Sequence, residues 1–319
     1  MPFTINTAYT LAEILKSYDP QGRLHHIIDV FSDKRPIMEE GFWSEANDFT
    51  SHEMLQLVSK PTGKFMRLDE GYDREGVATK PVKEQLGSVG SMMEIDMRVL
   101  KKQTDPVGWR TERTKLHLRG MLENFNRKFY VGSSATDPKE VDGLCTRYNA
   151  LGLANVKSLS GSANLYPVFV IKWGLDGAQL LYPKDGESTF KENDRGLVDL
   201  LDENGKPYPG YRSYFDLSYG IGVADDRCVQ RLVNVDVTAI KGTATFEEAL
   251  IEVINNLPGL DNAAIYVGRQ VMTAIQQRLN SKSNLYFTTE NVWGRMMPTF
   301  QGLPVIRDDA LSTAESAVS

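Results

Sequence analysis

The chain has 319 residues, of which 41% are hydrophobic and 24% are charged, enough apolar material for one to three globular domains. The formal net charge of −6 at pH 7 argues against a protein dedicated to reading nucleic-acid sequence, because such proteins are usually basic overall. No apolar run approaches the length of a membrane span, and Met1-Pro2-Phe3-Thr4 lacks the charged-then-apolar order of a signal peptide. We therefore expect neither a membrane-spanning nor a secreted chain.

Residues 1–50 are predicted to form an extended arm with short helical pieces. Thr10-Leu11-Ala12-Glu13 fits a capping box that opens a helix, and Asp19-Pro20-Gln21-Gly22 would end it. Leu24 to Phe31 is a second apolar piece, which Lys34-Arg35-Pro36 closes.

Residues 51–98 are predicted to form a long β-hairpin. Apolar residues alternate with charged ones from 93 to 99, and the outgoing strand is expected over 54–58 and 64–68, with a charged, glycine-rich tip at 69–76. A lone two-stranded hairpin is marginal in water, so we expect a neighbouring copy of the chain to cover its apolar face. The residues expected at that contact are Met93, Ile95 and Met97 on the returning strand and Phe65 and Arg67 on the outgoing strand.

A long helix is the best-defined element of the sequence. Asp105 is the expected N-cap, with Pro106 at the first helical position, where its missing N–H costs nothing. Leu118, Leu122, Phe125 and Phe129 recur at helical spacing, Trp109 and Met121 widen the stripe, and Gly132 is available as the C-terminal stop. At 1.5 Å per residue the helix would be about 40 Å long and could form the spine of a subunit.

The flanks of this helix are basic. Nine Lys or Arg residues lie between Arg98 and Lys128, against only three acidic residues. Two interpretations remain open, a solvated helix face and a surface that faces a polyanion. The residues expected on such a surface are Lys101, Lys102, Arg110, Arg113, Lys115 and Arg119.

From about residue 139 the pattern changes to a compact α+β domain. Strands are expected over residues 166–173, 179–182, 196–201, 208–212, 214–223, 228–237 and 263–267, with an Asn204-Gly205 hairpin turn. Two helices are expected, one opened by the capping box Thr245-Phe246-Glu247-Glu248 and one carrying Val271, Met272, Ile275 and Leu279. Residues 299–307 are predicted to form one strand with a glycine interruption, and residues 308–319 are predicted to fray.

Residues that could carry catalysis are sparse. The histidines show no metal-ligand spacing, and there is no Gly-x-Ser-x-Gly motif, Walker loop or dinucleotide fingerprint. Gly220-Ile221-Gly222 indicates a bulge or a close strand crossing, and Asp225-Asp226-Arg227 a charged turn. Cys145 and Cys228 are expected to be reduced, buried thiols of a cytosolic protein. We predict no catalytic residue, cofactor or metal, and no enzyme activity.

Several short segments, spread in order from about residue 20 to residue 311, share their sequence with one family. The segments are Arg67-Leu68-Asp69-Glu70-Gly71, Phe129-Tyr130-Val131-Gly132, Gly143-Leu144-Cys145-Thr146-Arg147-Tyr148-Asn149, Trp173-Gly174, Leu181-Tyr182-Pro183-Lys184, Gly210-Tyr211-Arg212, Arg231-Leu232-Val233-Asn234-Val235-Asp236 and Phe300-Gln301-Gly302-Leu303-Pro304-Val305-Ile306-Arg307-Asp308-Asp309-Ala310. With the order of elements, they make the chain resemble the major capsid proteins of epsilon15-type short-tailed phages, which have the HK97 fold of tailed bacteriophages.

The resemblance implies an α+β capsid fold with five parts. These would be an N-terminal arm (1–50), an extended loop (51–98), a peripheral domain with the spine helix (99–138), an axial domain (139–290) and a C-terminal strand returning to the peripheral domain (291–319). It implies a structural subunit that assembles in the host bacterial cytoplasm into hexamers and pentamers of an icosahedral virion head around double-stranded DNA. Since no long N-terminal scaffolding segment is seen, a separate scaffolding protein is expected, with a portal, a decoration protein as a further partner and no membrane.

Two other functions remain open at this point. An encapsulin-like nanocompartment shell would share the fold but enclose cargo enzymes, so particle contents would distinguish it from a phage head. An α+β enzyme with an unrecognised site is a remote alternative, and its mark would be a deep pocket with converging carboxylates or histidines.

Overall fold

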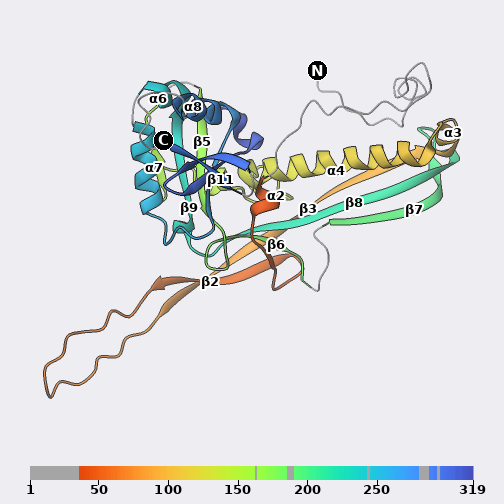
Figure 1. Cartoon of the computed structure of the whole chain (residues 1–319). Helices are drawn as coiled ribbons and strands as arrows, with labels where there is room; N and C mark the ends of the chain where they lie inside the picture. The colour runs from red at the N-terminus through yellow and green to blue at the C-terminus, as the bar shows by residue number, and fades with distance from the viewer. Residues whose placement is uncertain are drawn as a thin grey trace. The chain divides into compact units, whose positions relative to one another are not determined.

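The computed structural model describes residues 36–161, 164–184, 190–242, 245–279, 287–292 and 295–318. Both helical pieces expected before residue 36 lie outside these residues. The described chain divides into two compact units (Figure 1). Unit 1 holds residues 88–126 and 190–218, and unit 2 holds the remaining described residues. No helix in the described part of the chain is long and apolar enough to cross a membrane.

Unit 1 is a helix lying along a set of long strands (Figure 1). Its helix is the first part of α4 (Pro106–Val131), and its strands come from β3 (Ala78–Asp96), β7 (Phe190–Leu201) and β8 (Pro207–Val223). The backbone N–H of Gly108 donates to Asp105 Oδ1 over 2.9 Å, so the predicted N-cap is confirmed. The β7–β8 hairpin turns at Gly205, whose φ of 74° is readily adopted by glycine.

The helix covers one face of these strands. Ser91 Oγ on β3 lies 2.9 Å from His117 Nδ1 on α4, and the His117 ring stacks on Phe215 of β8 with 5.9 Å between centroids. Side chains on a strand alternate, so Met93 and Ile95 lie on the same face as Ser91. Trp109, Met121 and Phe125 of α4 are buried, as the apolar stripe predicts.

This packing corrects part of the prediction for the returning strand. Met93 and Ile95 are 2% and 1% exposed within a single chain, so they need no neighbouring copy for cover. The strand also ends earlier than predicted. Asp96 accepts a hydrogen bond from the Arg98 backbone N–H over 2.7 Å and so caps a short helix, α3 (Met97–Leu100), which takes up the half-buried Met97.

Unit 2 is built on a seven-stranded sheet of order β11-β12-β13-β10-β5-β9-β4. The strands are β4 (Val156–Ser158), β5 (Leu165–Lys172), β9 (Val229–Asp236), β10 (Ala263–Val267), β11 (Phe287–Val292), β12 (Arg295–Phe300) and β13 (Leu303–Arg307). Alternate residues of its central strands, among them Val168, Val170 and Ile265, form one core with three helices. These helices are α6 (Val237–Gly242), α7 (Thr245–Asn255) and α8 (Arg269–Leu279), and the last two were predicted.

The opposite face of this sheet carries aromatic side chains. Tyr130, near the end of α4, lies 5.3 Å from Phe169 of β5 between ring centroids, and Phe129 lies 6.2 Å from Trp173. Successive side chains of β5 therefore pack on opposite faces of the sheet, since Phe169 points away from the core that Val168 and Val170 form.

A smaller set of strands in unit 2 supports a projecting loop. β1 (Trp43–Glu45), after the short helix α2 (Pro36–Glu40), pairs in parallel with β6 (Ala178–Tyr182), which pairs with the last residues of β8. β2 (Ser51–Ser59) pairs with the first half of β3 from Ser51↔Gln85 to Ser59↔Ala78. We call residues 51–85 the projecting loop (Figure 1).

The predicted outgoing strand over residues 64–68 is wrong, because residues 60–77 form no strand. Local contacts replace the ladder there. Lys64 Nζ bonds Glu70 and Asp73, and the Arg67 backbone N–H donates to Glu70 over 2.9 Å.

The C-terminal segment also differs from its prediction. Residues 299–307 form the end of one strand and a second strand, joined by a turn at Gln301 and Gly302, both with positive φ. The tail to residue 318 does not fray. Val318 and Asn234 exchange two hydrogen bonds of 2.9 and 3.0 Å, and Glu315 bonds Arg231.

Candidate assembly surface

The tip of the projecting loop exposes large apolar side chains that nothing in the described part of the chain covers. Phe65 is 104% exposed, Leu68 98% and Tyr72 89%. On β2, Leu55 and Leu57 are also exposed and point away from the half-buried His52, Met54 and Gln56. Apolar side chains grouped in this way, among charged ones, mark a surface for contact with another molecule.

The predicted contact residues fall into two classes. Phe65 and Arg67 are exposed on the projecting loop, so their role in a contact between copies stays a prediction. Met93 and Ile95 are core residues of unit 1, and Met97 belongs to α3. The exposed apolar set therefore extends from residue 55 to residue 77, upstream of the stripe on which the sequence prediction relied.

The base of the projecting loop is tied to unit 2 by polar side chains. Arg147, at the end of α5 (Leu144–Arg147), donates from Nη1 and Nη2 to the two carboxylate oxygens of Glu84 over 2.6 and 2.7 Å. The same guanidinium donates to the carbonyls of Asp142 and Ile221 over 2.8 and 3.2 Å. Side-chain exposures of 17% for Arg147 and 12% for Glu84 make this bidentate pair well shielded from water.

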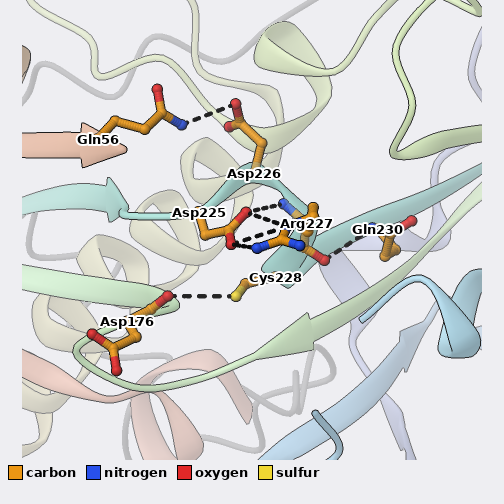
Figure 2. Close-up of polar contacts among 7 residues, drawn as sticks. All are labelled: Gln56, Asp176, Asp225, Asp226, Arg227, Cys228 and Gln230. Atoms are coloured by element: carbon orange, nitrogen blue, oxygen red, sulfur yellow. Dashed lines mark hydrogen bonds and ion pairs between the residues drawn. The ribbon is translucent and has the colours of Figure 1, made fainter. Parts of the chain in front are cut away.

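A second tie lies on the other strand of the loop. Gln56 Nε2 donates to Asp226 Oδ2 over 3.3 Å, and the Tyr148 hydroxyl donates to Asp226 Oδ1 over 2.9 Å. Figure 2 shows Gln56 reaching toward Asp226, while the neighbouring Asp225 pairs with Arg227. The sequence interpretation of a charged turn holds for Asp225 and Arg227, but Asp226 has a longer-range partner.

Sequence reasoning did not pair these residues with one another because the partners are remote along the chain. Glu84 and Arg147 are 63 positions apart, and Gln56 and Asp226 are 170 apart. No local period or spacing brings such pairs together. The only signal was the family-like segment 143–149, which contains Arg147 and Tyr148.

The predicted basic surface of α4 is partly neutralised. Arg110 bonds Asp194 over 2.6 Å and Ser213 over 2.9 Å, Arg113 lies over the Trp109 ring, and Lys115 pairs with Glu112. Lys101 and Lys102, before the helix, are exposed, as is Arg119. The six residues do not form one uniform cationic face.

Unit 2 also buries several ionisable groups. Arg231 is 1% exposed and donates to Glu315 over 2.5 Å and to the Tyr148 carbonyl over 2.7 Å. The Tyr266 hydroxyl donates to Glu40 over 3.1 Å, and burial raises the pKa of Glu40 to about 7 although that bond opposes the rise. These contacts hold α2 and the C-terminal tail against the sheet.

The two thiols are not placed for nucleophilic chemistry. Both cysteines are free, and burial raises the pKa of Cys145 to about 12 and that of Cys228 to about 11, which disfavours a reactive thiolate. Cys228 is buried as predicted and Cys145 is half-buried. Among the described residues, no cluster of His, Cys, Asp and Glu is placed to hold a metal ion.

Known structures share this architecture. The structure of bacteriophage Epsilon15 aligns with a TM-score of 0.73 at 22% identity, covering 100% of this chain and 99% of that chain. The bacteriophage JBD30 capsid aligns with a TM-score of 0.54 at 10% identity, covering 96% and 100%. The SrpI encapsulin of Synechococcus elongatus PCC 7942 aligns with a TM-score of 0.49 at 11% identity, covering 73% and 98%. The fold is the α+β, HK97-like fold of phage capsid proteins, as the sequence predicted.

The family model described as Major capsid protein GP7 matches residues 19–319. The chain belongs to this family, and it is a major capsid protein of a tailed phage, a structural component of an icosahedral virion. No curated protein matches the sequence. The family resemblance predicted from the short motifs is confirmed.

Proposed function

We propose that this capsid protein assembles into hexamers and pentamers that close around double-stranded DNA, and that residues 51–98 act as the extended loop of the subunit. Its projecting part, residues 51–85, lies over an adjacent copy. The observation that carries the proposal is the set of exposed apolar side chains at the loop tip, Phe65, Leu68 and Tyr72. A large aromatic anchor that is fully exposed in one copy is typical of the centre of an interface.

The loop is suited to contact a second copy because a closed shell repeats every contact by symmetry. Each copy would donate one loop and receive one, so a modest gain per contact is multiplied around the capsomer. The local charges fit this arrangement, since residues 60–77 hold four basic and four acidic side chains and so carry no net charge to repel an identical neighbour.

The double substitution Phe65→Ser and Leu68→Ser tests the proposal. Neither side chain packs on the described residues of its own chain, so the subunit should keep its melting temperature while shells, counted by electron microscopy and sedimentation, fall at least tenfold. Leu175→Ser is the matched control, because Leu175 is 69% exposed but lies outside the loop. Normal shell yield from the double variant would overturn the proposal.

We further infer the roles of the other parts. Residues 1–50 serve as the N-terminal arm, residues 99–138 with the returning strand in 291–319 as the peripheral domain, and residues 139–290, apart from the β7–β8 hairpin, as the axial domain. The β7–β8 hairpin packs with α4 through Arg110, Asp194 and Ser213, which supports grouping that hairpin with the peripheral domain.

We also infer the partners from the capsid role. Assembly would take place in the host cytoplasm with a separate scaffolding protein, a portal and, as a further partner, a decoration protein. Exposed basic residues near α4, chiefly Lys101 and Lys102, would make weak contacts with packaged DNA. The subunit would act as a structural part of the head and not as an enzyme.

A further inference from the structure

The projecting loop is long compared with the contacts that hold it. Measured from Glu84, its tip lies up to about 50 Å away if the strand were fully extended. A pivot of about 10° at the base would then move the tip by about 9 Å, which is larger than any side-chain contact distance. A loop that must meet a fixed site on another copy therefore needs a defined direction at its base.

Two separate polar ties meet this need. Arg147 bonds Glu84 on β3, and Glu84 is paired with His52 of β2. Asp226 bonds Gln56 on β2, and Gln56 is paired with Lys80 of β3. The two positions are four residues apart along the ladder, about 13 Å. β3 also pairs with β8 in the sheet, and two further ties on different strands of the loop add resistance to rotation in the plane of the hairpin.

The contacts behind each tie are themselves fixed. Arg147 is held by the carbonyls of Asp142 and Ile221 as well as by Glu84, so its guanidinium has little freedom. Asp226 is held by the Tyr148 hydroxyl, and its own carbonyl accepts from Asn155 Nδ2 over 3.3 Å. Arg147 and Tyr148 are adjacent in sequence, so one short segment at the C-terminal end of α5 contacts both strands of the loop.

We propose that Arg147–Glu84 and Gln56–Asp226–Tyr148 together form a root clamp that sets the direction of the projecting loop for docking on a second copy. The effect on assembly rests on the proposed function of the loop, whereas the effect on loop direction does not. These are positioning residues, because they act on the contact through the loop and do not touch the partner.

The direct test measures the loop in unassembled subunits. Spin labels are placed at Thr62→Cys on the loop and Gln277→Cys on α8, both exposed and both in unit 2, in a Cys145→Ala, Cys228→Ala background that has first been shown to form shells. Double electron–electron resonance then gives the distribution of distances between the labels. Wild type should give one narrow distribution, and Glu84→Ala one at least twice as wide.

Graded variants separate positioning from stability. Glu84→Gln keeps the size and one acceptor, so it should fall between wild type and Glu84→Ala in both distribution width and shell yield. Arg227→Ala is the matched control, because it removes the ion pair with Asp225 in the same turn and leaves Gln56 and Tyr148 unchanged. The Arg227 side chain is 65% exposed. It should leave both measurements unchanged.

The outcomes discriminate between the two proposals. An unchanged distance distribution in folded Glu84→Ala would overturn the root clamp. A broadened distribution with normal shell yield would keep the clamp but overturn its link to assembly, and with it the docking role of the loop. If Glu84→Ala does not fold, Gln56→Ala tests the root clamp instead. The Gln56 side chain bonds Asp226 over 3.3 Å at the surface, so losing this bond should widen the distance distribution between the labels without unfolding unit 2.

Discussion

At Glu40, burial beside the Tyr266 hydroxyl keeps a carboxyl group protonated up to about pH 7. Glu39 and Asp308 act in the same direction, because nearby negative charge disfavours ionisation. Asp308 is itself fully buried and accepts from the Tyr130 hydroxyl over 3.0 Å. The hydrogen bond between Glu40 and Tyr266 thus involves a carboxyl group whose pKa is about 7.

The pKa of Glu40 rises from 4.5 in the unfolded chain to about 7 in the folded one, so between these values the folded state holds a proton that the unfolded state has lost. Stability should therefore fall as pH rises from about 4.5 to 7 and stay lower above. Glu40→Gln removes this loss and should be about 1–2 kcal/mol more stable than wild type at pH 8, after allowing for partial solvent screening.

Denaturant unfolding at pH 4.5 and pH 8 checks the prediction. The difference between Glu40→Gln and wild type should be small at the acidic pH and grow with pH, because only wild type loses a proton. A difference that is equal at both pH values would show that the substitution acts through packing alone.

A second residue-scale prediction concerns the buried pair of Arg231 and Glu315. Glu315→Ala leaves a guanidinium that is 1% exposed without its carboxylate, which should cost about 3–5 kcal/mol of unfolding free energy. Glu252→Ala is the matched control, because its ion pair with Lys157 is exposed on both sides and should contribute about 0–1 kcal/mol. If Glu315→Ala lowered the unfolding free energy no more than Glu252→Ala does, the contact of the tail with Arg231 would not stabilise the fold.

At the scale of elements, α4 shows how a local pattern and its environment agree. Asp105, Pro106 and the apolar stripe predict where the helix begins and which side is buried, and Gly132 donates to the Lys128 carbonyl over 2.9 Å just after its end. The β3 strand shows the opposite case. Its alternation continues past Asp96 in the sequence, but the cap at Asp96 converts residues 97–100 to a helix.

The helix gives the element-scale prediction. Phe125→Ala removes a ring that is 0% exposed and should lower the unfolding free energy by about 3–5 kcal/mol. Val107→Ala, on the same helix but 76% exposed, should change it by less than about 0.5 kcal/mol. Thermal unfolding of the two variants side by side tests the burial of the stripe, and similar small losses in both would contradict it.

At the scale of the whole molecule, an acidic chain is proposed to enclose a polyanion. One tight DNA contact per subunit would be repeated many times in the shell and would oppose release of the genome, so weak contacts from a few exposed lysines suit both states. Arg110 and Lys115 are already paired within the chain, which leaves Lys101 and Lys102 as the exposed basic pair nearest the helix.

Charge reversal tests this proposal. Lys101→Glu with Lys102→Glu should leave empty-shell yield unchanged while lowering packaged DNA, measured by ultraviolet absorbance of purified particles, and the loss should shrink as added salt screens the phosphates. Lys139→Glu, an exposed lysine after α4, is the control. Unchanged DNA content would support the alternative of a solvated helix face.

The sequence by itself determined the elements whose signal is local and the family to which the chain belongs. The N-cap at Asp105, the apolar stripe of α4, the buried strands at residues 165–172 and 263–267 and the Asn204-Gly205 turn depend on neighbours within a few positions, so they could be predicted. The projecting loop was also predicted as a hairpin, although its outgoing strand is shorter than expected.

Only the tertiary structure decided which faces are covered and which charges are paired. Met93 and Ile95 are buried because α4, which follows them in sequence, folds back over their face of the strand. The C-terminal tail is ordered because it forms hydrogen bonds with Arg231 and Asn234 of the sheet. The root clamp joins residues 63 and 170 positions apart. Burial and ion pairing depend on residues that the fold brings together from distant parts of the chain, so local sequence periodicity cannot predict them.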